Sequence, residues 1–133
     1  MPSYLDNAAA KVASAAGWRE PKPDGEGRYH FALQGGLALD MFSPDGNAII
    51  LRAAVQLLPD EEAPRESLLR AKAKLAVAAS RERKTVLALE GDDLILHQVV
   101  PAKETPLENM PGIVKAFLND LDWWKAQAAR LAS

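Results

Sequence analysis

Apolar residues near the N-terminus recur at intervals of three and four, which is the spacing of one face of an α-helix. Ser3 precedes this stretch and is a favourable N-cap residue, whereas Gly17 follows it and is a common helix stop. We therefore predict a helix from Tyr4 to Ala16. Its apolar face carries Leu5, Ala8, Ala9, Val12 and Ala16.

Three runs of alternating apolar and polar residues follow a loop that is rich in proline and glycine, residues 19–28. This alternation predicts half-buried strands over residues 29–34, 37–41 and 48–58. Gly35 and Gly36 separate the first two strands, and the segment 43–47 contains the Asp-Gly pair of a tight hairpin. The third strand has one face with Ile49, Leu51, Ala53, Val55 and Leu57, and another with Ile50, Arg52, Ala54, Gln56 and Leu58.

The middle of the chain predicts a second helix, from Pro64 to about Arg81. Proline suits the first turn of a helix, where its missing N–H group costs nothing. A second hairpin follows, with strands from Thr85 to Glu90 and from Leu94 to Val100 around the turn at residues 91–93. The apolar side of the middle helix carries Leu68, Leu69, Leu75, Ala76 and Ala79.

The C-terminal segment has the most regular helical pattern. Thr105 and Glu108 are spaced as a capping box, with Pro106 at the first helical position. Pro111 and Gly112 interrupt the pattern, which indicates either a short first turn with a restart after Asn109 or a kink. The apolar stripe consists of Leu107, Met110, Val114, Phe117, Leu121, Trp124, Ala128 and Leu131.

The order of these elements is α-β-β-β-α-β-β-α. It predicts one α+β domain over residues 1–133, in which helices pack on a twisted antiparallel sheet. A chain of 133 residues with 48% hydrophobic residues is long enough to bury one core.

Composition excludes several function classes. The chain has no cysteine, so disulfides and thiolate chemistry are absent. The net charge is −2 and basic residues are interspersed with acidic ones, which argues against nucleic-acid binding. We see neither a run of about 20 apolar residues that would insert into a membrane nor the pattern of a signal peptide. We therefore expect a cytoplasmic protein.

Catalytic signatures are also missing from the sequence. His30 and His97 both fall in predicted strands, and no carboxylate has metal-site spacing beside either of them. Asp45, Asp92 and Asp93 occupy turns, where aspartate is common. We predict no catalytic residues, no metal site and no cofactor. An enzyme that uses His30 or His97 with an aspartate is the minority alternative.

The predicted elements carry more apolar surface than one small core needs. One interpretation is that the core buries all of it, with the first helix covering the second face of the third strand. The other is a homodimer interface, together with surfaces that bind a peptide. For the dimer interface we predict Leu68, Leu69, Leu75, Ala76, Ala79 and Leu87. For partner binding we predict Leu5, Val12, Ile50, Arg52 and Ala54.

Several segments resemble class I type III secretion chaperones, the Tir-chaperone-like family. The similar segments are 31–33, 50–59, 68–69, 86–89, 94–97 and 117–124, together with the order of the elements. One departure is the end of the middle helix, Leu75 to Ser80, where members of the family often have a Leu-x-x-Asn-like ending.

The resemblance implies a homodimer that binds the N-terminal segment of a secreted effector protein and keeps it soluble for export, without cofactor or ATP. The effector would wrap around the dimer and place apolar side chains in shallow pockets. The alternatives are a peptide-binding or sensory module of similar fold outside secretion and, less favoured, a small hydrolase.

Overall fold

The computed structural model describes residues 3–33, 37–57, 85–90 and 93–132, together with Glu62, Glu66 and Arg70. The side chains of residues 56, 57 and 127–132 are excepted from this description.

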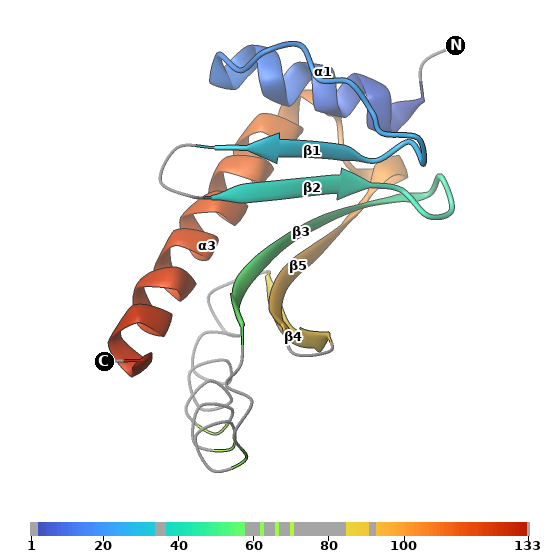
Figure 1. Ribbon diagram of the computed structural model, residues 1–133. Coiled ribbons are helices and arrows are strands. Elements are labelled where there is room, and N and C mark those ends of the chain that lie inside the picture. The colour runs from blue at the N-terminus through green and yellow to red at the C-terminus, as the bar shows by residue number, and fades with distance from the viewer. Residues whose placement is uncertain are drawn as a thin grey trace.

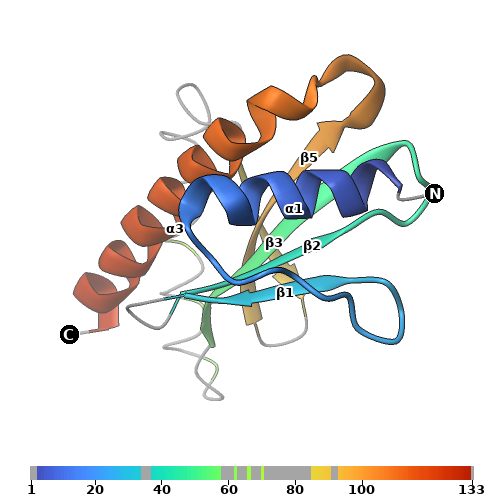
Figure 2. The same ribbon diagram turned by 90° about the horizontal axis from the view of Figure 1, so that it is seen from above.

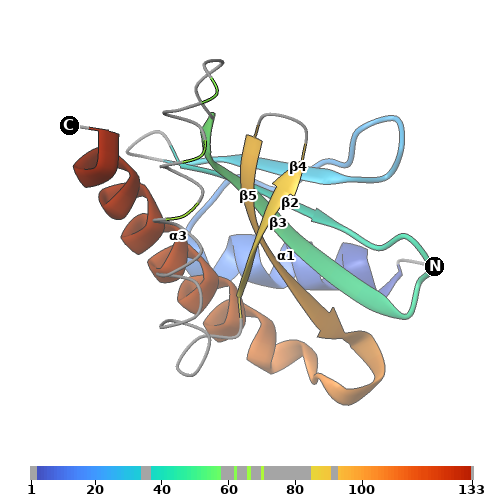
Figure 3. The same cartoon turned by 90° about the horizontal axis from the view of Figure 1, so that it is seen from below.

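The described part of the chain is an antiparallel five-stranded sheet with helices on one of its faces (Figure 1). The strands lie in the order β1-β2-β3-β5-β4. Seen from above, α1 lies in front of the strands, whereas from below the strands lie in front of α1 (Figures 2 and 3). The elements are α1 (Tyr4–Ala16), β1 (Tyr29–Ala32), β2 (Ala38–Phe42), β3 (Ala48–Leu57), β4 (Val86–Glu90), β5 (Asp93–Pro101), the 3₁₀ turns η2 (Ala102–Glu104) and η3 (Leu107–Asn109), and α3 (Met110–Ala132). The predicted α+β fold is confirmed.

Helix α1 begins and ends where the sequence predicts. The Ser3 hydroxyl accepts a hydrogen bond from the backbone N–H of Asp6, and the Asp6 carboxylate accepts one from the backbone N–H of Ser3. This reciprocal pair is a capping box. At the other end, Gly17 adopts the left-handed conformation with φ 74°, which costs glycine little and other residues more.

The β2–β3 hairpin turns through Asp45 and Gly46. The Asp45 carboxylate accepts hydrogen bonds from the backbone N–H groups of Asn47 and Ala48, at 2.9 and 3.3 Å. Gly46 has φ 77°, a conformation that its lack of a Cβ permits. The turn is therefore held by the residue types that predicted it.

Strand β3 is the centre of the sheet, because it pairs with β2 on one side and with β5 on the other. A β-bulge interrupts its pairing with β5 between Ala54 and Gln56. Alternation divides its side chains between two faces. The face toward the helices, here called the inner face, carries Ile49, Leu51, Ala53 and Val55, all of them buried in the core.

The C-terminal helix starts differently from the prediction. A 3₁₀ turn, η3, comes first with Pro106 as its N-cap, and no side chain caps it. The predicted capping box of Thr105 and Glu108 is therefore wrong, because the first turn starts one residue later than that motif requires. The α-helix then restarts at Met110, as one of the two predicted alternatives proposed. Pro111 lies in its first turn, where no N–H donor is needed.

The predicted stripe of α3 packs on the sheet as far as Trp124, and the side chains of Ala128 and Leu131 lie outside the described ones. Its buried members are Met110, Val114, Phe117, Leu121 and Trp124. Trp123 is partly buried and packs edge-on against Trp124, with ring centroids 4.9 Å apart. Among the described residues, no helix is both long enough and apolar enough to cross a membrane.

The predicted middle helix lies almost entirely outside the described residues. Only Glu62, Glu66 and Arg70 of this segment are described, and each is helical and exposed. Their spacing of four places them on one face of a helix. The apolar residues predicted for the opposite side are not among the described ones.

Candidate functional site

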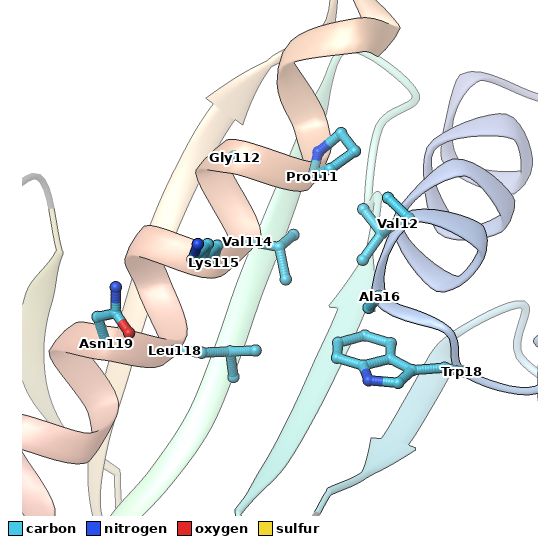
Figure 4. Close-up of a pocket in the computed structure, with 10 residues that line it drawn as sticks. Val12, Ala16, Trp18, Pro111, Gly112, Val114, Lys115, Leu118 and Asn119 are labelled. Carbon is cyan, nitrogen blue, oxygen red and sulfur yellow. The ribbon is translucent and has the colours of Figure 1, made fainter.

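An apolar groove runs between α1 and α3, with a volume of about 420 Å³. Figure 4 shows Val12, Ala16 and Trp18 on one side of it, facing Pro111, Val114 and Leu118 on the other. Val12 and Val114 are buried and form its deeper part, whereas Leu118 and Trp18 are partly exposed. Concave, mostly apolar surfaces of this kind bind apolar side chains of ligands.

Trp18 is held in the groove by the way α1 ends. Gly17 turns the chain back, and the backbone N–H of Trp18 donates to the carbonyl of Ala13 at 2.8 Å. The indole ring then packs on Phe31 of β1, with ring centroids 5.1 Å apart and a tilt of 44°. Trp18 is therefore anchored by the core while part of its ring stays exposed.

The wall on α3 owes its shape to the first turns of that helix. Gly112 has no side chain, and a Cβ built there would meet nothing within 4 Å. Lys115 and Asn119 supply the polar edge of the wall, and Leu118 lies between them along the helix. The groove thus has an apolar floor and a mixed rim, as binding surfaces commonly do.

Two tyrosines fix the start of α1, at the end of the helix away from Trp18. The Tyr4 hydroxyl donates to the carbonyl of Thr105 at 2.6 Å, and the Tyr29 hydroxyl donates to the Asp6 carboxylate at 2.5 Å. Burial, and then the hydrogen bond to Asp6, raise the pKa of Tyr29 to about 12. The bond from Tyr29 is also the main cause that lowers the pKa of Asp6.

The opposite face of the sheet, here called the outer face, carries an apolar row. Phe42 pairs with Ile50, and Ile50 pairs with Val99, so the three lie side by side across β2, β3 and β5. Val99 is 57% exposed. The Arg28 guanidinium lies over the Phe42 ring, 4.5 Å from its centroid. Next to this row is a hollow of about 450 Å³ lined by Arg28, Phe42, Ile50, Arg52, Ala88, Leu89, Glu90, Ile95 and His97.

A row of charged and titratable side chains crosses the outer face beside the apolar row. His30 contacts Asp24 through Nε2 at 2.7 Å and Asp40 through Nδ1 at 2.6 Å. Asp40 also faces Arg52, at 3.8 Å, and Arg52 pairs with Glu90 at 2.7 Å. Hydrogen bonds to Asp40 and then Asp24 raise the pKa of His30 above its usual value.

This arrangement does not suit His30 for general-base catalysis. A base needs a ring nitrogen free to accept the substrate's proton, and both nitrogens of His30 already contact carboxylates. No local pattern predicts that a carboxylate orients this histidine. The contact arises from the register of β1 and β2, which pairs His30 with Asp40. His97 lies on β5, two strands beyond Asp40 in the same row. Within the described residues, no three His, Asp or Glu side chains are grouped to hold a metal ion.

The predicted partner-binding residues fall into two groups. Leu5 and Val12 are 8% and 2% exposed and belong to the core, so the structure places them mainly in internal contacts, although Val12 also lines the groove. Ile50 and Arg52 are half-buried and Ala54 is exposed, all on the outer face. The interpretation in which the first helix covers that face is wrong, because α1 packs with the inner-face residues.

Of the predicted dimer-interface residues only Leu87 is described. It is half-buried on β4 and packs against the core. Leu68, Leu69, Leu75, Ala76 and Ala79 lie outside the described residues, so their role in an interface stays a prediction.

Trp18 and Leu118 line the groove but were not among the residues predicted to bind a partner. A signal for Trp18 was present, since a tryptophan directly after a helix-ending glycine is placed where the chain turns back on the helix. Leu118 follows the buried Phe117 and therefore flanks the stripe rather than belonging to it. The groove itself depends on the distance between two helices, which no local pattern encodes.

Comparison with known proteins gives one family match. The model of the Tir chaperone protein (CesT) family matches residues 8–125. No curated protein matches the chain.

Solved structures share the fold, among them the following three. The HopA1–SchA chaperone–effector complex contains a chain that is 13% identical, with 92% of this chain and 94% of that chain covered and a TM-score of 0.68. The ExsC–ExsE complex contains a chain that is 15% identical, with 92% of this chain and 91% of that chain covered and a TM-score of 0.70. The structure of the Yersinia pestis type III secretion chaperone SycH, in complex with a stable fragment of YscM2, contains a chain that is 9% identical. The match covers 92% of this chain and 99% of that chain, with a TM-score of 0.62.

Proposed function

The chain belongs to the Tir chaperone protein (CesT) family, and on this premise we propose that it is a non-catalytic chaperone for a type III secreted effector. It binds the N-terminal segment of that effector in the bacterial cytoplasm and keeps the segment soluble until export. The observation that carries the proposal is the family match over residues 8–125. The similar folds in the chaperone–effector complex HopA1–SchA and in SycH with its YscM2 fragment support it.

The groove between α1 and α3 offers a physical basis for this binding. An unfolded segment exposes apolar side chains, and burying them contributes roughly 25 cal/mol per Å² of apolar area. Trp18 and Leu118 present such area on a wall that the core already holds in place. The walls of the groove are therefore ordered before a ligand binds, which reduces the entropy cost of association.

The outer face is the second proposed contact surface. Ile50 and Val99 supply apolar area there, and Arg52 with Ala54 continues the surface along β3. An extended segment lying over this face would meet apolar and charged side chains alternately. Binding of this kind uses neither ATP nor a cofactor.

We further propose that the protein is a homodimer, with the middle helix and Leu87 at the interface. The motive is the apolar side that the sequence predicts for this helix, with Leu68, Leu69, Leu75, Ala76 and Ala79. An obligate homodimer interface is typically large and apolar.

A hydrolase is the less favoured alternative. The observation against it is the double engagement of His30 by Asp24 and Asp40, which leaves neither ring nitrogen to accept a proton from a substrate. The other alternative is a binding module outside secretion, which would use the same surfaces. The identity of the bound partner distinguishes such a module from a secretion chaperone.

The experiment is affinity capture from the source bacterium with matched variants on α3. Wild type is compared with Leu118→Asp, which places a charge on the groove wall, and with Ala126→Asp, which places the same charge on an exposed site of the same helix. We expect wild type and Ala126→Asp to retain one secreted protein, and Leu118→Asp to lose it while keeping its circular dichroism spectrum.

Two results would contradict the proposal. One is a captured protein that is not exported by the bacterium, which would favour a binding module outside secretion. The other is retention of the secreted protein by Leu118→Asp at the wild-type level, which would remove the groove from the binding surface.

A further inference from the structure

His30 lies on the edge strand β1 and contacts two carboxylates that come from different elements. Asp24 belongs to the loop that precedes β1, and Asp40 belongs to β2. β1 is an edge strand and pairs only with β2 among the described strands. The two contacts of His30 therefore add to the backbone hydrogen bonds between β1 and β2. The side chain is 53% exposed, so protons reach it freely.

The geometry of the two contacts specifies the protonation state. A neutral imidazole has one N–H group, which donates to one carboxylate and leaves the other ring nitrogen as an acceptor. An acceptor nitrogen within 2.7 Å of a carboxylate oxygen is repelled by it. Both contacts are at hydrogen-bond distance, at 2.6 and 2.7 Å, which is the geometry that favours a proton on each ring nitrogen. The arrangement is that of an imidazolium between two carboxylates.

The charges around His30 extend this pattern. From the loop to β4 the order is Asp24, His30, Asp40, Arg52 and Glu90, which alternates in sign only when His30 is protonated. Glu26 and Arg28, the charged residues that follow Asp24 in the loop, pair with each other at 3.6 Å. The other charged residues of the loop, Arg19, Glu20 and Lys22, precede Asp24.

We propose that protonated His30 is a clamp, which means that it holds the edge strand β1 to Asp40 of β2 and to Asp24 of the preceding loop at the same time. Its deprotonation breaks one of these two hydrogen bonds. Asp24 holds the loop as well, since its other oxygen accepts the backbone N–H groups of Glu26 and Arg28. A neutral His30 still bonds one of its two carboxylates and releases the other. The edge strand is therefore held more weakly at high pH than at low pH.

The direction of the pH effect follows from linkage. The pKa of His30 is raised in the folded protein, chiefly by its hydrogen bonds to Asp40 and Asp24. The clamp is therefore complete below the ordinary histidine value of about 6.5 and is lost as the pH rises through the folded value. Asp24 is ionised throughout this window, because the bond from His30 and the loop N–H groups lower its pKa to about 2.

The test combines a histidine titration with amide hydrogen exchange. Imidazole nitrogen NMR spectra of the full-length protein follow His30 and His97 from pH 5 to 9. Amide exchange is then measured at two pH values on either side of the His30 midpoint and corrected for intrinsic exchange. We compare wild type with His30→Gln, and use His97→Gln as the control for loss of a histidine from the same face.

The expected result has three parts. His30 titrates above its ordinary value with both ring nitrogens protonated below the midpoint. Protection of the amides of β1 and residues 24–28 falls as the pH rises, by up to about tenfold for each unit by which the folded pKa exceeds the ordinary one. His30→Gln abolishes this fall, whereas His97→Gln retains it at the wild-type level. The amides shared by β3 and β5 show no such fall in any of the three proteins.

A midpoint at or below about 6.5 overturns the proposal, since it means that the carboxylates do not favour the imidazolium. The same pH dependence in His30→Gln as in wild type also overturns it. Should His30→Gln fail to fold, Asp24→Asn serves instead, because it keeps the histidine and removes one carboxylate. Asp24→Asn should lower the His30 midpoint, and an unchanged midpoint refutes the clamp.

Discussion

The two faces of the sheet are made by the same alternation but have different roles. Ile49 and Ile50 are neighbours in β3, yet Ile49 is buried in the core and Ile50 is half-buried on the outer face. What separates them is that α1 and α3 both pack with the inner-face residues. The views from above and below show α1 on that side of the sheet (Figures 2 and 3). Alternation thus divides side chains into two sets, and helix packing decides which set carries the stability.

The difference extends to the kind of interaction on each face. The inner face is held by apolar packing among side chains from α1, α3 and four strands. The outer face has an apolar row, Phe42, Ile50 and Val99, beside the row of charged groups that includes His30. Apolar packing is insensitive to pH, whereas the charged row responds to it.

The largest effect is expected at the centre of the inner face. Phe117 on α3 is 0% exposed, and Phe117→Ala should lower the free energy of unfolding by about 3–5 kcal/mol, because it removes buried area and leaves a cavity. Urea unfolding followed by circular dichroism measures this change. A cost near zero would mean that α3 binds a partner rather than the core.

The pair Ile49 and Ile50 tests the contrast most closely, because the two substitutions are chemically identical. Ile49→Ala should cost about 2–5 kcal/mol, as truncations of fully buried residues do. Ile50→Ala should cost less than about 1 kcal/mol, because part of its side chain already contacts water. Denaturant unfolding of both variants gives the comparison. Equal costs would show that the outer face is covered as fully as the inner one.

A smaller effect is expected at the hydrogen bond between Tyr29 of β1 and Asp6 of α1. Tyr29→Phe removes the hydrogen bond to Asp6 and should cost about 1 kcal/mol. The same bond lowers the pKa of Asp6, so its contribution is present above the ordinary aspartate value of about 3.9 and is lost as the pH falls. The cost of Tyr29→Phe should therefore shrink in unfolding experiments at about pH 3. A cost independent of pH would point to packing instead.

The smallest effect is expected at the groove. Gly112 lies within α3, its φ is not positive, and a Cβ there would meet nothing within 4 Å. Gly112→Ala should therefore stabilise the protein by about 0.4–1 kcal/mol, because alanine loses less backbone entropy on folding. Thermal unfolding reports the shift in Tm. A destabilised variant would indicate that the groove is narrower than the structure shows.

The fold could be predicted from the sequence because its signals are local. Ser3 and Gly17 bound α1, Asp45 and Gly46 make the hairpin turn, and the stripe around Phe117 defines α3. The restart of α3 at Met110 was one of the two predicted alternatives, whereas the predicted capping box before it was wrong. The motif of Thr105 and Glu108 suggested a capped helix, but the chain makes a 3₁₀ turn there.

The candidate site was harder to predict because it depends on distances between elements. Ile50, Arg52 and Ala54 follow from alternation alone and do lie on the outer face. Trp18 and Leu118 face each other only because α1 and α3 lie side by side, and His30 meets Asp40 only through strand register. Burial of Leu5 and Val12 likewise depends on which face of α1 the sheet and α3 cover.

We propose that this chain binds the N-terminal segment of an exported protein through preformed apolar surface. Calorimetric titration of that segment, taken from the captured partner, into the wild-type protein measures this binding. We predict stoichiometric binding with a negative heat-capacity change, the signature of apolar burial, and much weaker binding to Leu118→Asp than to Ala126→Asp. Binding that requires the rest of the partner and not its N-terminal segment would contradict the account.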